Sequence, residues 1–296
     1  MAVPAAFDKT GAPGSTGATS AFGRVEIRGT TRLYAVLGYP VAQVKAPGML
    51  NPLFAWLGLD AVLVPVLAEP GHLGEVVRGL QRMGNVDGLL VTVPHKAEVR
   101  QYADTVSAAA EQSGGANALR REPDGTWHAD NFDGAGFVAG LRTAGWDPVG
   151  MRVSVVGAGG AGGALVPALL AAGADHIDVS DPDPERLRSL FGRVAAAWPG
   201  RSSCAAAPRL NAADLVVNAT PLGMRADDPL PFDPSRLPDH AVVADIIMQP
   251  RETALLRTAA ERGLRIHHGE HMLSHQIPLY REFFRLGSAQ ASDSGR

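Results

Sequence analysis

The sequence predicts an α/β protein with two domains. Short apolar runs alternate with helical patterns along most of the chain, which is typical of parallel strands covered by helices on both faces. The alternation is interrupted at residues 120–129, and a new strand with a glycine-rich turn begins at Val153. A chain of 296 residues is long enough for two domains with separate cores. We therefore expect a domain junction near residues 133–150.

The expected elements follow one another in regular order. Pro-Asp-Gly inside residues 120–129 predicts a hairpin turn. The expected strands are 33–37, 61–66, 88–93, 153–156, 177–179, 215–218 and 242–246. The expected helices are 47–57, 71–83, 96–101, 137–144, 162–172, 184–197, 253–262 and 270–285.

The composition is that of a soluble globular protein. Hydrophobic residues make up 46% and charged residues 19%, and the formal net charge is -3. No basic surface favours nucleic acid and no polybasic run favours membrane, so we expect neither as a partner. The single cysteine, Cys204, excludes an intrachain disulfide, and we expect it to be a small, at least half-buried apolar residue. The N-terminus lacks a charged region leading into an apolar one, so we expect a cytoplasmic protein.

Residues 152–164, RVSVVGAGGAGGA, match a dinucleotide-binding turn. The first glycine of G-x-G-x-x-G allows the tight turn, the second lets a pyrophosphate approach, and the third lets the helix pack close to the strand. We expect the cofactor at Gly157, Gly159, Gly160, Ala161 and Gly162, because the strand before and the helix after are both present. The alternative is an alanine- and glycine-rich helix start without a ligand.

Asp181 ends the next strand, 24 residues after Gly157. An acid there accepts hydrogen bonds from the adenosine ribose and repels a 2′-phosphate. We therefore predict NAD as the preferred cofactor, with NADP as the second choice. Alternatively, Asp181 only caps the Asp-Pro-Asp-Pro turn that it begins.

The third segment on this side is DLVVNATPLGM, residues 214–224. At the carboxyl end of a parallel strand, Asn218, Thr220 and Pro221 would line the nicotinamide side of the crevice. Taken alone, the segment is equally compatible with a plain strand and turn.

Two charged residues follow strand-like segments in the other half of the chain. In DGLLVTVPHK, residues 87–96, Pro94 stops the sheet ladder and Lys96 emerges at the carboxyl edge. In NFDGAG, residues 131–136, Asp133 lies in a tight turn before a helix. Each residue taken alone is most often a solvated charge or a helix cap.

Together these segments resemble the shikimate dehydrogenase family. The resemblance covers roughly residues 30–287 and is specific, since unrelated dinucleotide-binding proteins share only the glycine motif. The matching segments are VTVPHK at 91–96, GGANAL at 114–119, NFDGAGF at 131–137, VVGAGGAGGA at 155–164, NATPLGM at 218–224 and GEHMLSHQ at 269–276.

The resemblance implies a substrate-binding catalytic domain and a Rossmann-type domain with a doubly wound parallel sheet. The first spans residues 24–133 and regains the last helix at 268–287, and the second spans 134–267. Residues 1–23 and 288–296 remain as tails that we expect to be disordered.

The resemblance also implies roles for single residues. Lys96 and Asp133 would form a catalytic pair that exchanges a proton with a secondary alcohol while the nicotinamide exchanges a hydride. A lysine in a cleft loses its proton more readily, because burial disfavours the charged form. The other implied site residues are Thr92, Asn117 and Gln276 beside the substrate and Met272 near the nicotinamide.

The chain departs from the family where the substrate carboxylate would be held. Val44 and Ala46 replace the two serines of an S-x-S-P segment, Leu90 replaces an asparagine and Met248 a tyrosine. Hydrogen bonds to a charged group contribute roughly 1.5–3 kcal/mol each, so losing two weakens binding by orders of magnitude. We therefore expect a small-molecule substrate other than shikimate, such as another cyclic polyol. Lys45 is either a solvated charge or a replacement ligand for a carboxylate.

Two other classes of protein stay open. The segment HHGEHMLSH at 267–275 holds four histidines, and His271 and His275 lie one helical turn apart, a spacing found in metal-dependent hydrolases. The HExxH order is absent and no third ligand is evident, so we expect no metal. A nucleotide-binding regulator without catalysis is the other alternative, although it would not need both Lys96 and Asp133. The sequence leaves room for a homodimer.

Overall fold

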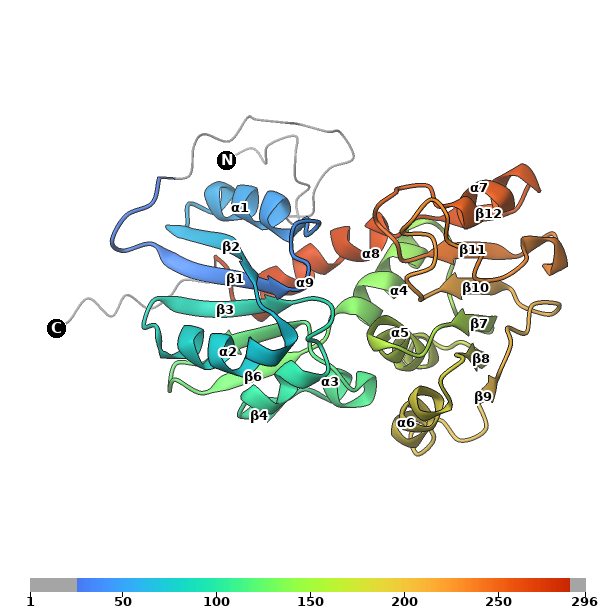
Figure 1. Ribbon diagram of the computed structural model, residues 1–296, viewed down its shortest axis with the longest axis horizontal. Helices are drawn as coiled ribbons and strands as arrows, with labels where there is room; N and C mark the ends of the chain where they lie inside the picture. The colour runs from blue at the N-terminus through green and yellow to red at the C-terminus, as the bar shows by residue number, and fades with distance from the viewer. Residues whose placement is uncertain (1–25, 288–296) are drawn as a thin grey trace. The chain divides into compact units, whose positions relative to one another are not determined.

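The computed structural model describes residues 26–287, and the predicted disordered tails lie outside these residues (Figure 1). The described chain forms two compact units. Unit 1 runs to Val106, resumes over Ala116–Asp130 and resumes again at Gln276, whereas unit 2 comprises Ser107–Gly115 and Asn131–His275. The domain boundaries predicted from the sequence stay a prediction. The compact units differ from them mainly by including Ser107–Gly115 and residues 268–275 in unit 2.

Unit 1 is built on a mixed six-stranded sheet in the order β2-β1-β3-β5-β6-β4. The β2-β1-β3 part is parallel, and β5 and β6 form the antiparallel hairpin predicted around Pro-Asp-Gly. The strands are β1 (Arg32–Gly38), β2 (Ala61–Leu67), β3 (Val86–Val91), β4 (Thr105–Val106), β5 (Ala118–Arg121) and β6 (Trp127–Asp130). The helices of this unit are α1 (Ala46–Trp56), η1 (Pro70–His72), α2 (Leu73–Arg82), η2 (Glu98–Tyr102) and α9 (Gln276–Phe283).

The segment after β3 is not the predicted α-helix at 96–101. It forms a turn that leads into the short 3₁₀ helix η2. The carbonyl oxygen of Lys96 accepts a hydrogen bond from the Ala116 amide at 2.7 Å, so this oxygen is already committed outside any helical ladder. The side chain of His95 is buried and its Nε2 lies 2.7 Å from the Ala68 carbonyl oxygen. These two contacts hold the turn that presents Lys96.

Unit 2 contains the doubly wound parallel sheet that the sequence predicts. Its order is β12-β11-β10-β7-β8-β9, and every neighbouring pair is parallel. The strands are β7 (Arg152–Val156), β8 (His176–Ser180), β9 (Ser202–Ala205), β10 (Leu215–Asn218), β11 (Val242–Asp245) and β12 (Arg265–His267). The helices are α3 (Ala108–Ser113), α4 (Asp133–Thr143), α5 (Gly160–Ala171), α6 (Pro184–Val194), η3 (Pro234–Arg236), α7 (Ala254–Glu261) and α8 (Glu270–Ser274).

The central strands of this sheet are buried on both faces, as parallel strands require. On β10, Leu215 and Val217 pack in one core cluster with side chains of α4, α5 and α6. Val216 points to the opposite face and packs in a second cluster with side chains of α7. The strict alternation explains why the strand reads as a continuous apolar run in the sequence.

The predicted helix 270–285 is two helices, α8 and α9, which meet at His275. Pro278 is the third residue of α9, where its missing amide proton costs no hydrogen bond, but inside one long helix it would remove one. Five short elements were not predicted: α3, β4, β9, η3 and β12. Cys204 is exposed on the edge strand β9, so the prediction that it is at least half-buried was wrong.

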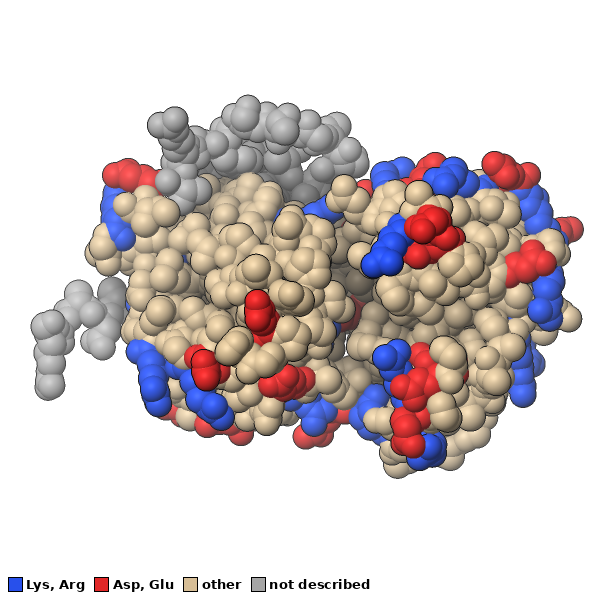
Figure 2. Space-filling model, viewed as in Figure 1, with Lys and Arg blue, Asp and Glu red and all other residues tan. Residues whose placement is uncertain are grey.

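Acidic and basic side chains are interspersed on the face shown in Figure 2. None of the helices within residues 26–287 combines the length and the apolar character that crossing a membrane requires.

Candidate active site

The carboxyl ends of β1 and β3 lie side by side in unit 1. The Thr92 amide donates to the Leu37 carbonyl oxygen at 2.9 Å, and the Tyr39 amide donates to Val93 at 3.0 Å. A Cβ on Gly38 would lie only 2.5 Å from Cγ2 of Thr92, so glycine is needed for this approach. The loop that joins β1 to α1 therefore begins beside Thr92.

Lys96 and Asn117 are brought together in the same unit. The Lys96 carbonyl oxygen accepts from Ala116, the residue before Asn117. The Asn117 backbone bridges two strands, since its amide donates to Asp130 and its oxygen accepts from Val91, both at 2.9 Å. Asn117 is 2% exposed. The sheet thus fixes Asn117 close in space to the turn that holds Lys96.

Gln276 completes this cluster from α9. Its Oε1 accepts from Nδ2 of Asn117 at 3.4 Å and from the hydroxyl of Tyr280. Both contacts use the amide oxygen, so they fix which way the side-chain amide faces. Tyr280 was not predicted from the sequence, although its position four residues after Gln276 places it on the same helix face.

The positions that differ from the family have no polar side-chain atoms for a carboxylate. Ala46 opens α1 and is 7% exposed, Leu90 lies in β3 and is 4% exposed, and Val44 is half-buried. Lys45 is exposed at the N-cap of α1. Met248, in unit 2, is half-buried in the segment that follows β11.

Asp133 begins α4 in unit 2 and is 2% exposed. Its amide donates to Oδ1 of Asn131 at 3.0 Å, and Nδ2 of Asn131 donates to the Gly115 carbonyl oxygen at 2.9 Å. Asn131 therefore ties the start of α4 to the end of the α3 segment. A side chain on Gly134 would overlap the Ala164 carbonyl oxygen, so α4 and α5 are in close contact just behind Asp133.

The glycine-rich loop has the shape that a dinucleotide requires. Gly157 has a φ of +106°, and a Cβ there would lie 2.9 Å from the Ala219 backbone. A Cβ on Gly162 would overlap the Gly157 carbonyl oxygen. By contrast, Gly159 and Gly160 have open space beside them. Gly157 and Gly162 therefore allow the backbone of the turn to pack closely. Gly159 and Gly160 leave room at the N-terminus of α5 for a pyrophosphate.

Asp181 is buried and accepts a hydrogen bond from the backbone of this loop. Its Oδ2 accepts from the Ala158 amide and its Oδ1 from the Asp183 amide, both at 2.8 Å. Asp183 in turn caps α6 by accepting from the Glu185 amide. Arg186 lies 3.9 Å from Asp181 and 3.4 Å from Asp183, and its side chain is 60% exposed. The hydrogen bond to the Asp183 amide is the one expected if Asp181 caps the turn that it begins, which was the alternative role.

Asn218 is fully buried and organises the turn that follows β10. Its Oδ1 accepts from the amide and the hydroxyl of Thr220, and its Nδ2 donates to the Leu222 carbonyl oxygen and to Asp245. Asp245, also fully buried, accepts from Thr253 at 2.7 Å, and its burial raises the pKa of its carboxyl. Thr220 is half-buried and Pro221 is exposed, so these two residues are the accessible part of the turn.

Two rings of the histidine segment stack against one another. The rings of His267 and His271 stack with centroids 4.8 Å apart, and His267 meets Phe137 and Trp146 edge-on. Between residues 26 and 287, no three His, Cys, Asp or Glu side chains are grouped to hold a metal ion. Met272 is 8% exposed and packs in the same core cluster as Ala158 of the glycine-rich loop and Ala219. The metal-dependent hydrolase alternative receives no support.

Comparison with known proteins shows which family the chain is similar to. Residues 36–119 match the family model for the shikimate dehydrogenase substrate binding domain. The chain is 42% identical over 258 residues to the shikimate dehydrogenase (NADP(+)) of Rubrobacter xylanophilus, which covers 84% of this chain and 89% of that protein.

Three solved structures share the fold. The shikimate dehydrogenase of Aquifex aeolicus has a TM-score of 0.79 and 28% identity, covering 88% of this chain and 98% of that one. A ligand-free 5-ketofructose reductase of Gluconobacter has a TM-score of 0.75 and 27% identity, covering 86% and 92%. A quinate dehydrogenase of Corynebacterium glutamicum in complex with NAD has a TM-score of 0.75 and 28% identity, covering 87% and 94%.

Unit 2 contains a parallel sheet of the dinucleotide-binding type, and residues 36–119 match a dehydrogenase substrate binding domain. Together with the named relatives, these findings define the class of this protein, an NAD(P)-dependent dehydrogenase. Within that class, the chain belongs to the shikimate dehydrogenase family. Because the relatives are named as enzymes, the reading as a regulator without catalysis also receives no support.

Proposed function

We propose that the chain oxidises or reduces a secondary alcohol on a hydroxylated ring compound and does not depend on a substrate carboxylate. One observation supports this substrate class above others. Unit 1 keeps Thr92, Lys96, Asn117 and Gln276 in one arrangement, while the positions expected to hold a carboxylate are apolar. The Gluconobacter relative is named for 5-ketofructose, a compound without a carboxylate, which supports this proposal.

In this proposal, Lys96 and Asp133 perform the proton transfer. The bound nicotinamide supplies the hydride acceptor or donor. As the carbonyl forms, the Lys96 amine takes the hydroxyl proton, and in the reverse direction the ammonium returns it. Asp133 is the second residue that we propose for this proton transfer, as the family resemblance implies. Asn117 and Gln276, fixed by their mutual hydrogen bond, orient neighbouring ring hydroxyls.

The substrate class is tested with a panel of shikimate, quinate and carboxylate-free cyclitols. We expect higher kcat/KM with at least one cyclitol than with shikimate. Restoring both hydroxyls by Val44→Ser with Ala46→Ser should raise kcat/KM for shikimate by about two orders of magnitude, since two hydrogen bonds to a charged group are regained. Strong activity of the unchanged chain on shikimate would refute the substrate class but leave the dehydrogenase assignment intact.

The role of Lys96 is tested by Lys96→Ala, with Lys45→Ala as the matched control. We expect the first variant to lose turnover while it keeps its affinity for the dinucleotide, measured by fluorescence titration. The control should lose little, because Lys45 is exposed at a helix cap. If Lys45→Ala also abolishes turnover, Lys45 is a substrate ligand. Near-normal turnover of Lys96→Ala would disprove the proton-transfer role.

We further propose NAD as the preferred cofactor, although the Rubrobacter relative is named for NADP(+). Asp181 and Asp183 put two carboxylates at the end of β8, where a 2′-phosphate would meet their repulsion. The nearby cation, Arg186, already lies within ion-pair distance of both. The Corynebacterium relative, which is in complex with NAD, supports this preference. The test is the ratio of kcat/KM with the two cofactors in the unchanged chain and in Arg186→Ala. A preference for NADP that disappears in Arg186→Ala would instead assign the 2′-phosphate to that arginine.

A further inference from the structure

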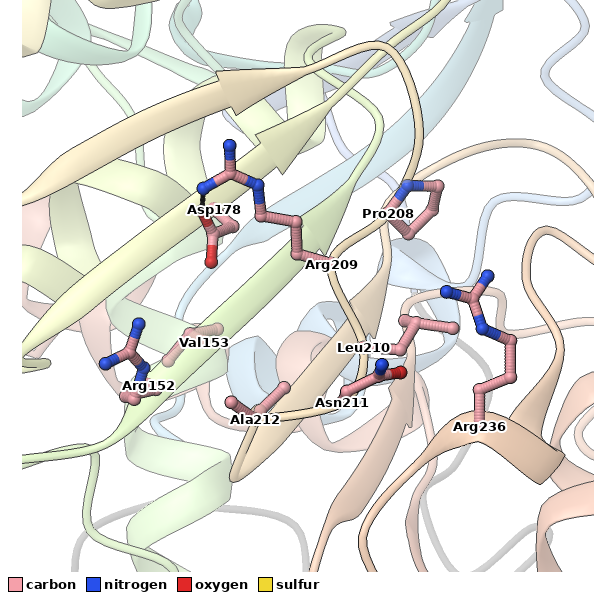
Figure 3. A pocket seen from close by; sticks show the side chains of 10 residues that line it. Arg152, Val153, Asp178, Pro208, Arg209, Leu210, Asn211, Ala212 and Arg236 are labelled. Carbon is pink, nitrogen blue, oxygen red and sulfur yellow. Dashed lines mark hydrogen bonds and ion pairs between the residues drawn. The ribbon is translucent and has the colours of Figure 1, made fainter.

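A hollow of about 290 Å³ lies in unit 2 at the end of the sheet where the strands begin (Figure 3). Arg152 and Val153 open β7, and Ala213 lies two residues before β10. Asp178 alternates along β8 with Ile177 and Val179, which face α5 and α6, so the hollow is on the opposite face of the sheet. The crossover between β9 and β10 forms its outer wall through residues 208–213.

Three arginines from three separate segments line this hollow. Arg152 belongs to β7, Arg209 to the crossover and Arg236 to η3. One acid, Asp178, lines it with them, and Figure 3 shows its side chain and that of Arg209 pointing toward one another. Nη1 of Arg209 lies 3.2 Å from Oδ1 of Asp178, so that charge is matched within the hollow.

The two other guanidinium groups are not matched in this way. Among the residues that the structure describes, neither Arg152 nor Arg236 has an ion pair or a side-chain hydrogen bond. Arg236 acts on Asp233 only through space, where its charge contributes to a lowered pKa of that carboxyl. Two of the three guanidinium groups that line the hollow thus form no ion pair among the described residues, and the Asp233 carboxylate offsets the charge of Arg236 only in part.

We propose that this hollow binds the phosphate group of a small metabolite or free inorganic phosphate. A phosphate monoester carries a charge near -2 at neutral pH and three acceptor oxygens, which matches two unpaired guanidinium groups. Arginine is suited to phosphate because its planar fork donates two parallel hydrogen bonds. Asn211, on the same wall, offers a further donor. A monocarboxylate would leave one of the two arginines uncompensated.

The site is separate from the one that holds the cofactor. The glycine-rich loop follows the last residue of β7, and the hollow lies at the first. Five residues of extended strand separate the two ends by roughly 16 Å. A phosphate in the hollow and a dinucleotide on the loop can therefore be bound at the same time.

The proposal is tested by calorimetric titration of the chain saturated with dinucleotide, so that the glycine-rich loop is already filled. The probes are inorganic phosphate and glycerol 3-phosphate at constant ionic strength, with chloride as the reference anion. We expect saturable binding that weakens about tenfold in Arg152→Ala and again in Arg236→Ala. Arg257→Ala removes an exposed arginine on α7 outside the hollow and should leave binding unchanged.

The two probes distinguish the source of the phosphate. Tighter binding of glycerol 3-phosphate indicates a phosphorylated metabolite, and tighter binding of inorganic phosphate indicates the free ion. Binding no stronger than that of chloride would overturn the proposal, as would equal affinity in Arg152→Ala and the unchanged chain. Both substituted arginines are on exposed positions, so thermal unfolding should confirm that each variant is folded.

Discussion

At the scale of single residues, the glycines of the dinucleotide loop divide into two kinds. Gly157 and Gly162 are glycines because the protein itself fills the space beside them. Gly159 and Gly160 are open to the surroundings. The first pair is therefore needed for folding, and the second pair leaves space that a ligand can occupy.

This division predicts different outcomes for two alanine substitutions. Gly159→Ala should change the free energy of unfolding by about 0.5 kcal/mol or less, since its φ of -72° suits alanine and nothing lies near its Cβ. Its affinity for the dinucleotide should fall at least about tenfold, because the methyl group occupies the approach of the pyrophosphate. Thermal unfolding and fluorescence titration measure the two quantities.

Gly162→Ala is the counterpart. It should lose stability even without cofactor, because the new methyl group would overlap the Gly157 carbonyl oxygen. Normal dinucleotide affinity of Gly159→Ala would show that the loop does not hold the pyrophosphate as proposed. Unfolding of this variant would show that Gly159 is itself needed for folding.

The sequence predicted which segments form the site better than it predicted what each residue does. Chain spacing identified Asn218, but only the fold shows that its side chain is fully used by Thr220, Leu222 and Asp245. Likewise, Asp181 is recognisable as the acid at a strand end, yet its contact with the Ala158 amide joins residues far apart in the chain. Hydrogen bonds of this kind depend on three-dimensional proximity, which a single sequence does not contain.

At the scale of elements, α3 is the clearest case of a helix held by tertiary contacts. It has six residues, too few to be stable alone. Ser107 caps its start, and Arg193 of α6 donates from Nε to the Gln112 carbonyl oxygen and from Nη2 to that of Ser113. The guanidinium group thus satisfies carbonyls that the helix end leaves without partners.

We expect Arg193→Ala to loosen α3 selectively. Loss of two hydrogen bonds from a charged group costs about 1–3 kcal/mol at a partly exposed site, so amide exchange in Ala108–Ser113 should accelerate about 10- to 100-fold. Hydrogen exchange followed by mass spectrometry measures this. The control is Arg188→Ala, at an exposed position of α6, and it should leave amide exchange in α3 unchanged. Equal acceleration in both variants would contradict the role of Arg193.

The central strands of unit 2 were predictable, whereas its edge strands and the short helix α3 were not. The central strands β7, β10 and β11 are apolar on both faces, so each was recognised from its composition. Strands β9 and β12 are edge strands of four and three residues, and α3 has no apolar stripe to detect. The turn at Lys96 was predicted as a helix because its hydrogen bond to Ala116 spans a distance in sequence that no local pattern reveals.

At the scale of the whole molecule, we expect His267 and His271 to lower stability in acid. Burial lowers the pKa of His267 to about 3, and the charges of neighbouring histidines act in the same direction. Burial also lowers the pKa of His271. In the unfolded chain a histidine takes up its proton near pH 6.5. Between these values the unfolded state binds more protons than the folded state, so stability falls as the pH drops below about 6.5.

The expected loss from His267 is about 2 kcal/mol between pH 7.5 and pH 5. His267→Phe should remove most of this loss, because a phenyl ring can pack against Phe137 and Trp146 without a proton to gain. Urea unfolding at the two pH values measures the difference for each variant. His72→Gln, at an exposed position of unit 1, should retain the full loss. An unchanged pH dependence in His267→Phe would show that other groups dominate.

The chain passes between the two compact units at Val106, at Gly115, at Asp130 and at His275. Neither unit is therefore a continuous stretch of the gene, and no single cut in the coding sequence separates them. The last passage matters most during synthesis on the ribosome. Side chains of the final segment, among them Tyr280 and Phe284, belong to the packing around Tyr34 and Gly88. The first strands to be translated therefore lack part of their packing until the last helix has been synthesised. All of unit 2 is synthesised before unit 1 is complete, so unit 2 can form its core first.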